Sequence, residues 1–182
     1  MILALVDRRS ERVPAAGAAL RAPWNLLCTL AGELGPADWR VDVVLVDDAA
    51  MTALNGGYRG ATGPTDVLSF SYLTGEDPGS GAAGVRSGER GACLDLWPDP
   101  LEAGAGAGPL AGEVVLAPVF ITARCGENAW PVEQEMALLV VHGCLHILGW
   151  EHDDEADRQA MMALETAVLR ACGLPHPLSK GA

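Results

Sequence analysis

The sequence predicts a single-domain α/β fold in which a four-stranded mixed sheet is packed with about five helices. The chain has 182 residues, which is the size of one domain with a proper core. Short apolar and β-branched runs predict strands, and longer segments with apolar residues at helical spacing, ended by Gly or Pro, predict helices. The two kinds of segment alternate along much of the chain, which is typical of α/β proteins.

Each expected element has a local reason. The strands are runs of β-branched and apolar residues bounded by turn residues, and they are expected at Ile2–Val6, Val41–Val46, Asp66–Tyr72 and Glu113–Val119. The first two helices are expected over Pro23–Leu34, which has an apolar stripe, and from a cap at Asp47 or Asp48 through Leu54, where Gly56 and Gly57 would stop it. The last three are expected at Ile121–Asn128, Val132–Leu148 and Asp154–Ala171, with Pro131 opening the middle one and Gly173 and Pro175 stopping the last.

Residues 75–112 differ from the rest of the chain. They are rich in Gly and Pro and include the run Ala103-Gly104-Ala105-Gly106-Ala107-Gly108, which cannot form a regular core element. We therefore expect a flexible insertion at about 75–112 within the single domain 1–182. The only candidate for an anchor in it is Cys93–Trp97.

Three of the four histidines fall within eleven residues. His142 and His146 are four apart, so on a helix they stand one turn above each other on the same face. Gly149 would end the helix in a left-handed conformation and turn His152 back as a third ligand. Three nitrogen ligands leave one tetrahedral position open, which is typical of catalytic zinc. The spacing predicts one Zn²⁺ per chain.

The histidines and their neighbours also have other possible interpretations. A single histidine in an apolar helix is more often a core or surface group, but three at this spacing favour a metal. Cys144 lies on the opposite side of the helix and should pack in the core, and His176, in a Pro-rich tail, is expected to be an exposed bystander. The spacing is that of the metzincin motif, except that Gly143 replaces the glutamate that acts as general base in those proteases. Peptide hydrolysis therefore loses support.

Three blocks of the chain resemble the YbeY family of bacterial rRNA-maturation endoribonucleases. His142–His152 resembles the motif His-Gly-x-Leu-His-Leu-x-Gly-Tyr-Asp-His, with Ile147, Trp150 and Glu151 as conservative departures. The other blocks are Leu54–Gly60 with Pro64–Phe70, and Gly112–Leu116. The resemblance implies a zinc-dependent endoribonuclease specific for single strands, a phosphodiester hydrolase that acts in 16S rRNA 3′ end processing and in ribosome quality control.

Arg59 is the candidate catalytic residue beyond the histidines. A guanidinium can grip a phosphate with two hydrogen bonds and stays charged. Alone, Arg59 would more often be a surface residue, but it matches the family's arginine within the Leu54–Gly60 block. The resemblance also implies that Thr65, Asp66 and Ser69 help line the cleft. Asp66 could instead order the loop, and Ser69 could simply face away from the core.

The expected chemistry is phosphodiester cleavage at the zinc. The metal would polarise the phosphate or activate the attacking oxygen, while Arg59 offsets charge on the phosphoryl group. The sequence leaves open whether the attacker is water or a ribose 2′-hydroxyl. Glu151 or Asp153 could be the general base, and both could equally be solvated turn residues.

The charge balance is unusual for an RNA-binding protein. Twelve Lys and Arg against 24 Asp and Glu give a net charge of −12, whereas phosphate binders normally present a basic face. A local groove can still be positive, and an acidic surface suits the basic proteins of the small ribosomal subunit. We expect RNA and this subunit as partners, and neither DNA nor membrane.

The cysteines and the N-terminal segment bear on the compartment. The chain has five cysteines, an odd and scattered set that favours free thiols in a reducing cytosol. No targeting segment is recognisable, and no apolar run is long enough to span a bilayer. A cytoplasmic protein is expected.

Two other functions are compatible with the sequence. The first is a metallohydrolase or metalloprotease acting on another substrate, which the metzincin spacing supports and Gly143 opposes. The second is a ribosome-associated protein without catalytic activity, whose zinc only stabilises the fold.

Overall fold

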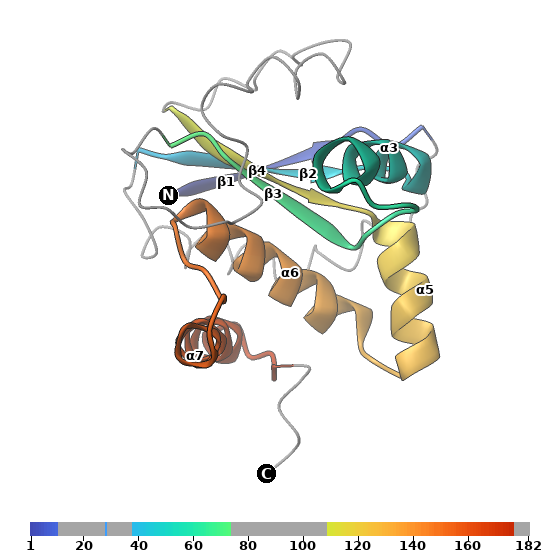
Figure 1. The fold of residues 1–182 in the computed structure, drawn as a ribbon. Helices are drawn as coiled ribbons and strands as arrows, with labels where there is room; N and C mark the ends of the chain where they lie inside the picture. The colour runs from blue at the N-terminus through green and yellow to red at the C-terminus, as the bar shows by residue number, and fades with distance from the viewer. Residues whose placement is uncertain (11–27, 29–37, 74–108, 177–182) are drawn as a thin grey trace.

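The computed structural model describes residues 1–10, 28, 38–73 and 109–176. Within these ranges a four-stranded sheet is packed with four helices (Figure 1). The strands are β1 (Ile2–Asp7), β2 (Arg40–Leu45), β3 (Val67–Ser71) and β4 (Leu110–Leu116), and the helices are α3 (Asp48–Arg59), α5 (Pro118–Asn128), α6 (Val132–Ile147) and α7 (Glu155–Ala171).

The sheet is mixed, as predicted. Its strand order is β1-β2-β4-β3, with β1, β2 and β4 parallel and β3 antiparallel to β4. β2 and β4 form the centre, and their mostly buried residues explain the nearly continuous apolar runs in the sequence. β3 lies at one edge of the sheet, and this edge borders the site described below.

Helices cover both faces of the sheet. α3 packs on one face, where Met51 and Leu54 join Phe70 in one apolar cluster. α5, α6 and α7 lie on the other face, where Leu145 and Leu169 join a larger cluster. In Figure 1, α6 runs directly beneath the sheet and α7 lies beyond it.

Alternate side chains of β3 point to opposite faces of the sheet. Leu68 and Phe70 are buried in the cluster that contains α3, so Val67, Ser69 and Ser71 are on the side that faces α6. The hydroxyl of Ser71 donates a hydrogen bond to the Ile147 carbonyl at the end of α6, at 3.2 Å. One side of an edge strand therefore faces the histidine-bearing helix.

The prediction that Gly56 and Gly57 end the second helix was wrong. α3 continues to Arg59, and Gly60, with φ 63°, caps it by donating its N–H to the carbonyls of Asn55 and Gly56. Two glycines inside a helix cost roughly 1 kcal/mol each, and the buried contacts of Met51, Leu54 and Asn55 outweigh that cost. Arg59 consequently sits on the last turn of a helix.

Two further expectations need correction. The described residues contain four helices, against about five expected, because Pro23–Leu34 lies outside the described residues apart from Cys28, which is helical. β4 begins at Leu110, so its first three residues belong to the segment assigned to the insertion, and residues 75–108 lie outside the described part. Pro118 opens α5 three residues before its predicted start.

Candidate metal centre

α6 and the turn after it bring the three predicted histidines together. Pro131 caps the helix, and the side chains of its middle section are buried against the sheet and α7. After Leu148, Gly149 adopts φ 89°, and the N–H of Trp150 reaches back to the Leu145 carbonyl at 3.0 Å. This left-handed reversal returns the chain over the helix end, as the sequence predicted for Gly149, and it carries His152 to the other two histidines.

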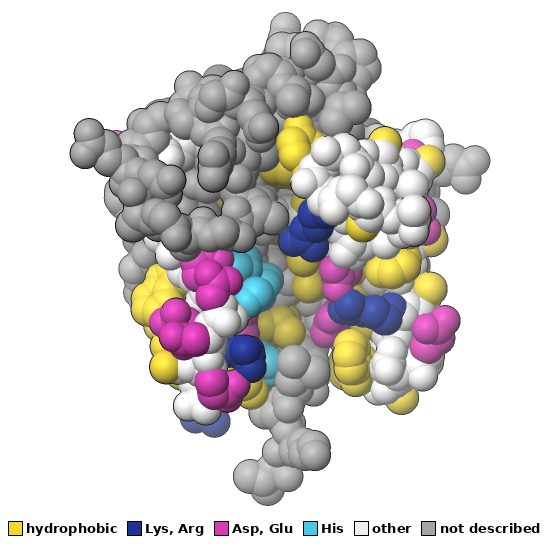
Figure 2. Space-filling view, in the orientation of Figure 1, with side chains coloured by type: hydrophobic (Ala, Val, Ile, Leu, Met, Phe, Trp, Pro, Cys, Tyr) yellow, Lys and Arg dark blue, Asp and Glu magenta, His cyan; other side chains and the backbone are white. Residues whose placement is uncertain are grey.

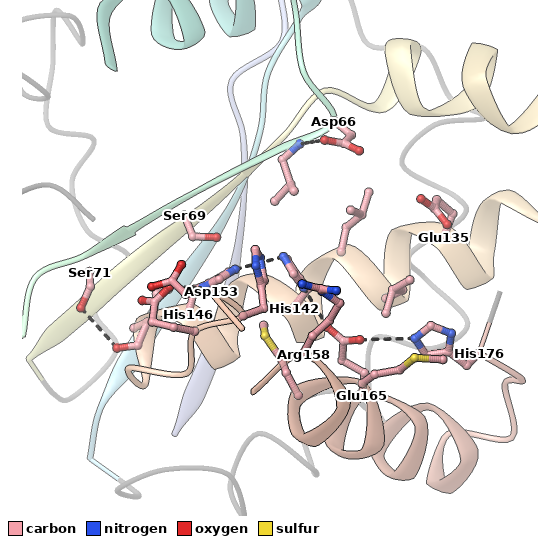
Figure 3. Close-up of a pocket in the computed structure, with 18 of the residues that line it drawn as sticks. Asp66, Ser69, Ser71, Glu135, His142, His146, Asp153, Arg158, Glu165 and His176 are labelled. Atoms are coloured by element: carbon pink, nitrogen blue, oxygen red, sulfur yellow. Dashed lines mark hydrogen bonds and ion pairs between the residues drawn. The ribbon is translucent and has the colours of Figure 1, made fainter. Parts of the chain in front are cut away.

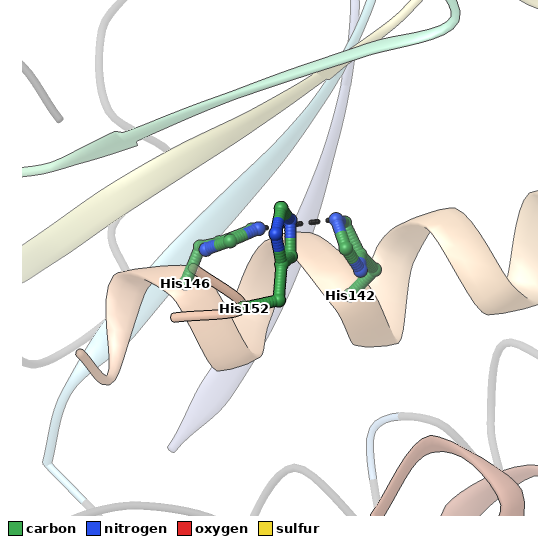
Figure 4. A group of neighbouring side chains, drawn as sticks. All are labelled: His142, His146 and His152. Carbon is green, nitrogen blue, oxygen red and sulfur yellow. Dashed lines mark hydrogen bonds between the residues drawn. The ribbon is translucent and has the colours of Figure 1, made fainter. Parts of the chain in front are cut away.

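The imidazole rings converge on one point (Figure 4). One ring nitrogen of each histidine lies within 4.8 Å of the others, and the Nε2 atoms of His142 and His146 are 3.0 Å apart. A tetrahedral zinc with nitrogen ligands would hold these nitrogens about 3.3 Å apart. His142 and His146 are half-buried and His152 is exposed, so the cluster is open on one side. The donor set therefore fits a metal ion with one free position.

The protonation state of His146 also suits a ligand. Burial, together with the charges of the neighbouring His142 and His152, lowers the pKa of its imidazole to about 4. The ring is neutral at pH 7, and metal ligation requires a neutral imidazole.

A buried carboxylate orients His142 from behind (Figure 3). Glu165 of α7 lies 2.8 Å from His142 Nδ1 through Oε1 and 3.3 Å from His176 Nε2 through Oε2. Burial raises the pKa of Glu165, but the hydrogen bonds from the two histidines outweigh it, so the net pKa is lowered. A carboxylate at Nδ1 favours the tautomer that leaves Nε2 free for a metal.

The prediction that His176 is an exposed bystander was wrong. Its side chain is almost fully buried beside Glu165. The cause is the turn after α7, where Gly173 has φ 70° and Leu174 donates its N–H to the Leu169 carbonyl. Glu165 itself was missed by sequence reasoning. Its place on the buried stripe with Met161 and Leu169 was the available signal, because a carboxylate is rarely buried without a partner.

The histidines lie in a cleft of about 900 Å³. Its walls come from the end of α3, the α6-facing side of β3, the exposed side of α6, the 151–153 turn and the start of α7. Figure 2 shows the hollow with histidines in it and basic side chains on both sides, while acidic side chains surround much of the rim.

Arg59 lines the same cleft from the last turn of α3. Its side chain is exposed, and it forms no ion pair with any residue in the described ranges. The structure thus places Arg59 and the three histidines around one cavity, although they are more than eighty positions apart in the sequence.

The remaining residues of the 64–70 block have distinct places. Asp66 orders its own loop, since Oδ1 accepts hydrogen bonds from the Val67 N–H at 2.8 Å and the Thr65 hydroxyl at 3.0 Å. Asp66 and Ser69 line the cleft, whereas Thr65 does not. Ser69 is on the side of β3 that faces α6, so it points toward the cleft and is not a solvent-facing strand residue.

An ion-pair cluster that the sequence did not reveal ties three elements together. The guanidinium of Arg124 in α5 binds both Asp66 and Glu135, and it lies 5.7 Å from the centre of the Trp130 ring. Glu135 is buried in α6, where burial raises its pKa and Arg124 opposes the rise. No spacing in the sequence could indicate this contact, because it joins the residue before β3 to α5 and α6 across the fold.

Glu151 and Asp153, the candidate bases, both line the cleft beside the histidines. Oε2 of Glu151 lies 3.6 Å from His146 Nδ1. Burial raises the pKa of Glu151, and the charge of Asp153 raises it further. Both carboxylates are therefore positioned within the site.

Gly143 marks the closest approach of α6 to the sheet. A Cβ atom at this position would lie 2.7 Å from Val114 Cγ1 and 2.9 Å from Ser69 Oγ. A side chain fits there only if the helix or the Val114 and Ser69 side chains shift. The glutamate of the metzincin motif therefore cannot occupy this position in this packing.

No helix in the described ranges is both long and apolar enough to cross a membrane.

Known proteins are similar to this chain in sequence and in fold. The profile of the family described as endoribonuclease YbeY matches residues 19–173. Proteins named endoribonuclease YbeY are similar to this chain. The one from Symbiobacterium thermophilum is 37% identical over 74% of this chain and 72% of its own length. The one from Magnetococcus marinus is 33% identical, covering 87% and 94%.

Matches also extend over nearly the full length. The endoribonuclease YbeY of Methylococcus capsulatus is 30% identical over 95% of both chains. A Thermotoga maritima protein solved in solution shares the fold, with a TM-score of 0.54 at 19% identity over 93% of this chain and 89% of that one. On the extent of the profile match and of the similarity to these relatives, the chain belongs to the endoribonuclease YbeY family.

Proposed function

We propose that this protein is a zinc-dependent endoribonuclease that cleaves single-stranded RNA during rRNA maturation, including processing of the 16S rRNA 3′ end, and that it acts in ribosome quality control. The observation that carries the proposal is the convergence of three imidazoles in a cleft that also holds Arg59. The names of the relatives, endoribonuclease YbeY, supply the substrate class.

The ligands of the metal are His142, His146 and His152. Three neutral nitrogen donors with one open side suit Zn²⁺. When bound, zinc supplies Lewis-acid stabilisation of charge on a phosphate. Glu165 keeps His142 in the ligating tautomer through its 2.8 Å contact with Nδ1.

Arg59 binds the phosphate undergoing cleavage. Its side chain extends from a capped helix end, and its guanidinium forms no ion pair with a carboxylate among the described residues. Two of its N–H groups can therefore donate to the nonbridging oxygens of the phosphate. Charge that develops on these oxygens strengthens the contact in the transition state. Glu151 and Asp153 are the carboxylates beside the histidines that can accept a proton.

Protein partners follow from the charge. A net charge of −12 favours contact with basic proteins such as those of the small ribosomal subunit. The rival activity, peptide hydrolysis, is opposed by Gly143, because the position that carries the base in metzincins has no room for a side chain.

A cleavage assay tests the proposal. Labelled single-stranded RNA, the same sequence as a duplex, and casein would each be incubated with metal-free protein, zinc-reconstituted protein and the Arg59→Ala variant. We expect zinc-dependent cleavage of the single strand alone and a fall of about 10²-fold or more in kcat for Arg59→Ala, with zinc content unchanged. Arg59→Lys should recover little, because an ammonium cannot form the two-pronged contact.

Arg170→Ala is the matched control, since Arg170 is exposed on α7 and does not line the cleft. Cleavage of casein but not RNA by the zinc-loaded protein would show that the protein is a protease. Inertness toward both substrates, with zinc bound, would favour a purely structural metal.

A further inference from the structure

Among the described residues, three arginines line the cleft that holds the histidines. They are Arg59 at the end of α3, Arg124 in α5 and Arg158 in the second turn of α7. A single-stranded nucleic acid presents one phosphate per nucleotide, so a cleft that takes it needs more than one cationic contact. The question is which arginines are available to phosphates.

Arg124 is not available. Its two terminal nitrogens bind Asp66 and Glu135, both of which are largely buried. The two carboxylates together carry more negative charge than Arg124 carries positive charge. If Arg124 turned to bind a phosphate instead, a buried carboxylate would be left unpaired, which is costly. Arg124 therefore organises the cleft wall and does not bind the strand.

Arg158 is held far more weakly. Its only ion pair within the described ranges is with Glu155, three residues earlier on the same helix, at 2.6 Å. The two side chains are 58% and 67% exposed, and exposed pairs of this kind contribute at most about 0.5 kcal/mol. A phosphate can displace Glu155 at little cost.

Arg59 and Arg158 reach the cleft from opposite faces of the sheet. α3 belongs to the apolar cluster on one face, and α7 to the cluster on the other. His152 immediately precedes the turn into α7, and Arg158 projects from that helix beside the histidines (Figure 3). An RNA strand that contacts both Arg59 and Arg158 therefore lies in the cleft that also holds the three imidazoles.

We propose that Arg158 is a second phosphate-binding residue, which holds a phosphate neighbouring the scissile one while Arg59 holds the scissile phosphate itself. The inference rests on the proposed function for its substrate, single-stranded RNA. It explains how an acidic protein accepts a polyanion, because the two arginines of the described cleft lining that are not neutralised by buried carboxylates enter the histidine-containing cleft from helices on opposite faces of the sheet.

Binding measurements test this role directly. Fluorescence polarisation of a labelled single-stranded RNA would be followed from about 50 to 200 mM salt with metal-free and zinc-loaded protein. Arg158→Ala should weaken binding several-fold and reduce the slope of log K against log salt by about 0.7, the value for one phosphate contact on a single strand. Arg170→Ala, on the same helix but away from the cleft, should change the slope much less.

Glu155 provides a test of opposite sign. If Arg158 only stabilised the helix through its ion pair, Arg158→Ala and Glu155→Gln would have the same effect. If Arg158 binds phosphate, Glu155→Gln frees it and tightens RNA binding. Glu127→Gln makes the same change in net charge at an exposed position outside the cleft and is the control for long-range electrostatics.

Turnover and modified RNA locate the contact. Arg158→Ala should raise KM several-fold with kcat nearly unchanged, in contrast to Arg59→Ala, because uniform binding is lost. Single methylphosphonates, which remove one negative charge, would be placed along the RNA. At one position next to the cleavage site, the methylphosphonate should weaken RNA binding by the wild type and leave RNA binding by Arg158→Ala unchanged.

Each outcome separates the two proposals. If the wild type cleaves RNA while Arg158→Ala matches Arg170→Ala in affinity, salt slope and KM, the role of Arg158 is wrong and the proposed function stands. If the wild type binds RNA through Arg158 but does not cleave it with zinc bound, the proposed function is wrong and the phosphate contact stands. Absence of RNA binding overturns both.

Discussion

At the scale of single residues, Glu165 matters as much as the histidines it supports. It is buried between His142 and His176, and its pKa is lowered because both imidazoles hydrogen-bond to it. A carboxylate in this position fixes the ring of a ligand before any metal arrives. The stability of the site therefore depends on a residue that touches no metal.

We expect Glu165→Gln to weaken metal binding by about 10- to 100-fold, because an amide accepts the Nδ1 hydrogen bond with much less electrostatic benefit. Competition with a chromophoric zinc chelator would measure the change. Glu133→Gln, at an exposed position in the first turn of α6, is the control. A zinc affinity of Glu165→Gln equal to that of the control would show that the contact has no role in ligation.

The residues that sequence reasoning found and missed differ in their separation along the chain. The three histidines lie in one helix and its turn, so helical periodicity and a helix-ending glycine were enough to bring them together. Glu165 and His176 approach His142 only through the packing of α7 on α6. Such contacts carry no periodic signal, and a single sequence contains no other record of them.

At the scale of elements, the packing of α6 on the sheet depends on Gly143. The helix comes so close that an added Cβ would overlap Val114 and the Ser69 hydroxyl. Because His142 and His146 are on the same helix, the distance between α6 and the sheet also sets how far their side chains reach into the cleft. A shift of α6 would therefore change the geometry of the site.

Gly143→Ala should destabilise the protein by about 1–3 kcal/mol, the usual cost of overpacking, even though alanine favours helix. Denaturant unfolding would measure it. Gly126→Ala is a matched control, because Gly126 is also helical, in α5, and a Cβ there meets nothing within 4 Å. That variant should gain up to about 1 kcal/mol from propensity alone. Equal gains for both variants would contradict the close packing of Gly143.

α3, which presents Arg59 on its last turn, depends on the capping residue before its first turn. Asp47 caps the helix by accepting the Ala50 N–H at 2.9 Å, and Ser10 donates its hydroxyl to the same carboxylate. These hydrogen bonds lower the pKa of Asp47. A lowered pKa means that the stabilisation is present at neutral pH and is lost as the pH falls below the ordinary value of an aspartate, about 3.9, through the folded value.

Asp47→Ala should lower the free energy of unfolding by about 1 kcal/mol at pH 7. This difference in stability from the wild type should shrink as the pH is lowered below about 3.9, the ordinary pKa of an aspartate. Urea unfolding at a series of pH values would measure both. Asp38→Ala, at an exposed position before β2, should show neither effect. A difference that persists unchanged at low pH would rule out the charged cap as its source.

At the scale of the whole molecule, the sequence predicted the sheet well and the element ends less well. Strand identity followed from β-branched runs buried on both sides, as in β2 and β4. The end of α3 was placed too early, because glycine propensity was outweighed by burial of Met51 and Leu54. The strand order was not derivable, since β4 inserts between β2 and β3 through contacts that form only in the folded chain.

The cleft itself is acidic before a metal binds. Among the described residues that line it, carboxylates outnumber arginines, with Asp66, Glu135, Glu151, Asp153 and Glu165 against Arg59, Arg124 and Arg158. A divalent cation at the histidines would offset this excess. We expect zinc loading to raise the affinity for single-stranded RNA by several-fold at low salt. Polarisation titrations of zinc-loaded and metal-free protein would measure it, and equal affinities would contradict the electrostatic account.

Because of this excess of carboxylates, the binding of zinc and the binding of RNA in the cleft are thermodynamically linked. If bound zinc raises the affinity of the protein for RNA, bound RNA must raise the affinity of the protein for zinc by the same factor. The RNA-bound protein would then retain zinc in the presence of chelators that remove zinc from the free protein. When zinc is scarce, the molecules without bound RNA would therefore lose activity first.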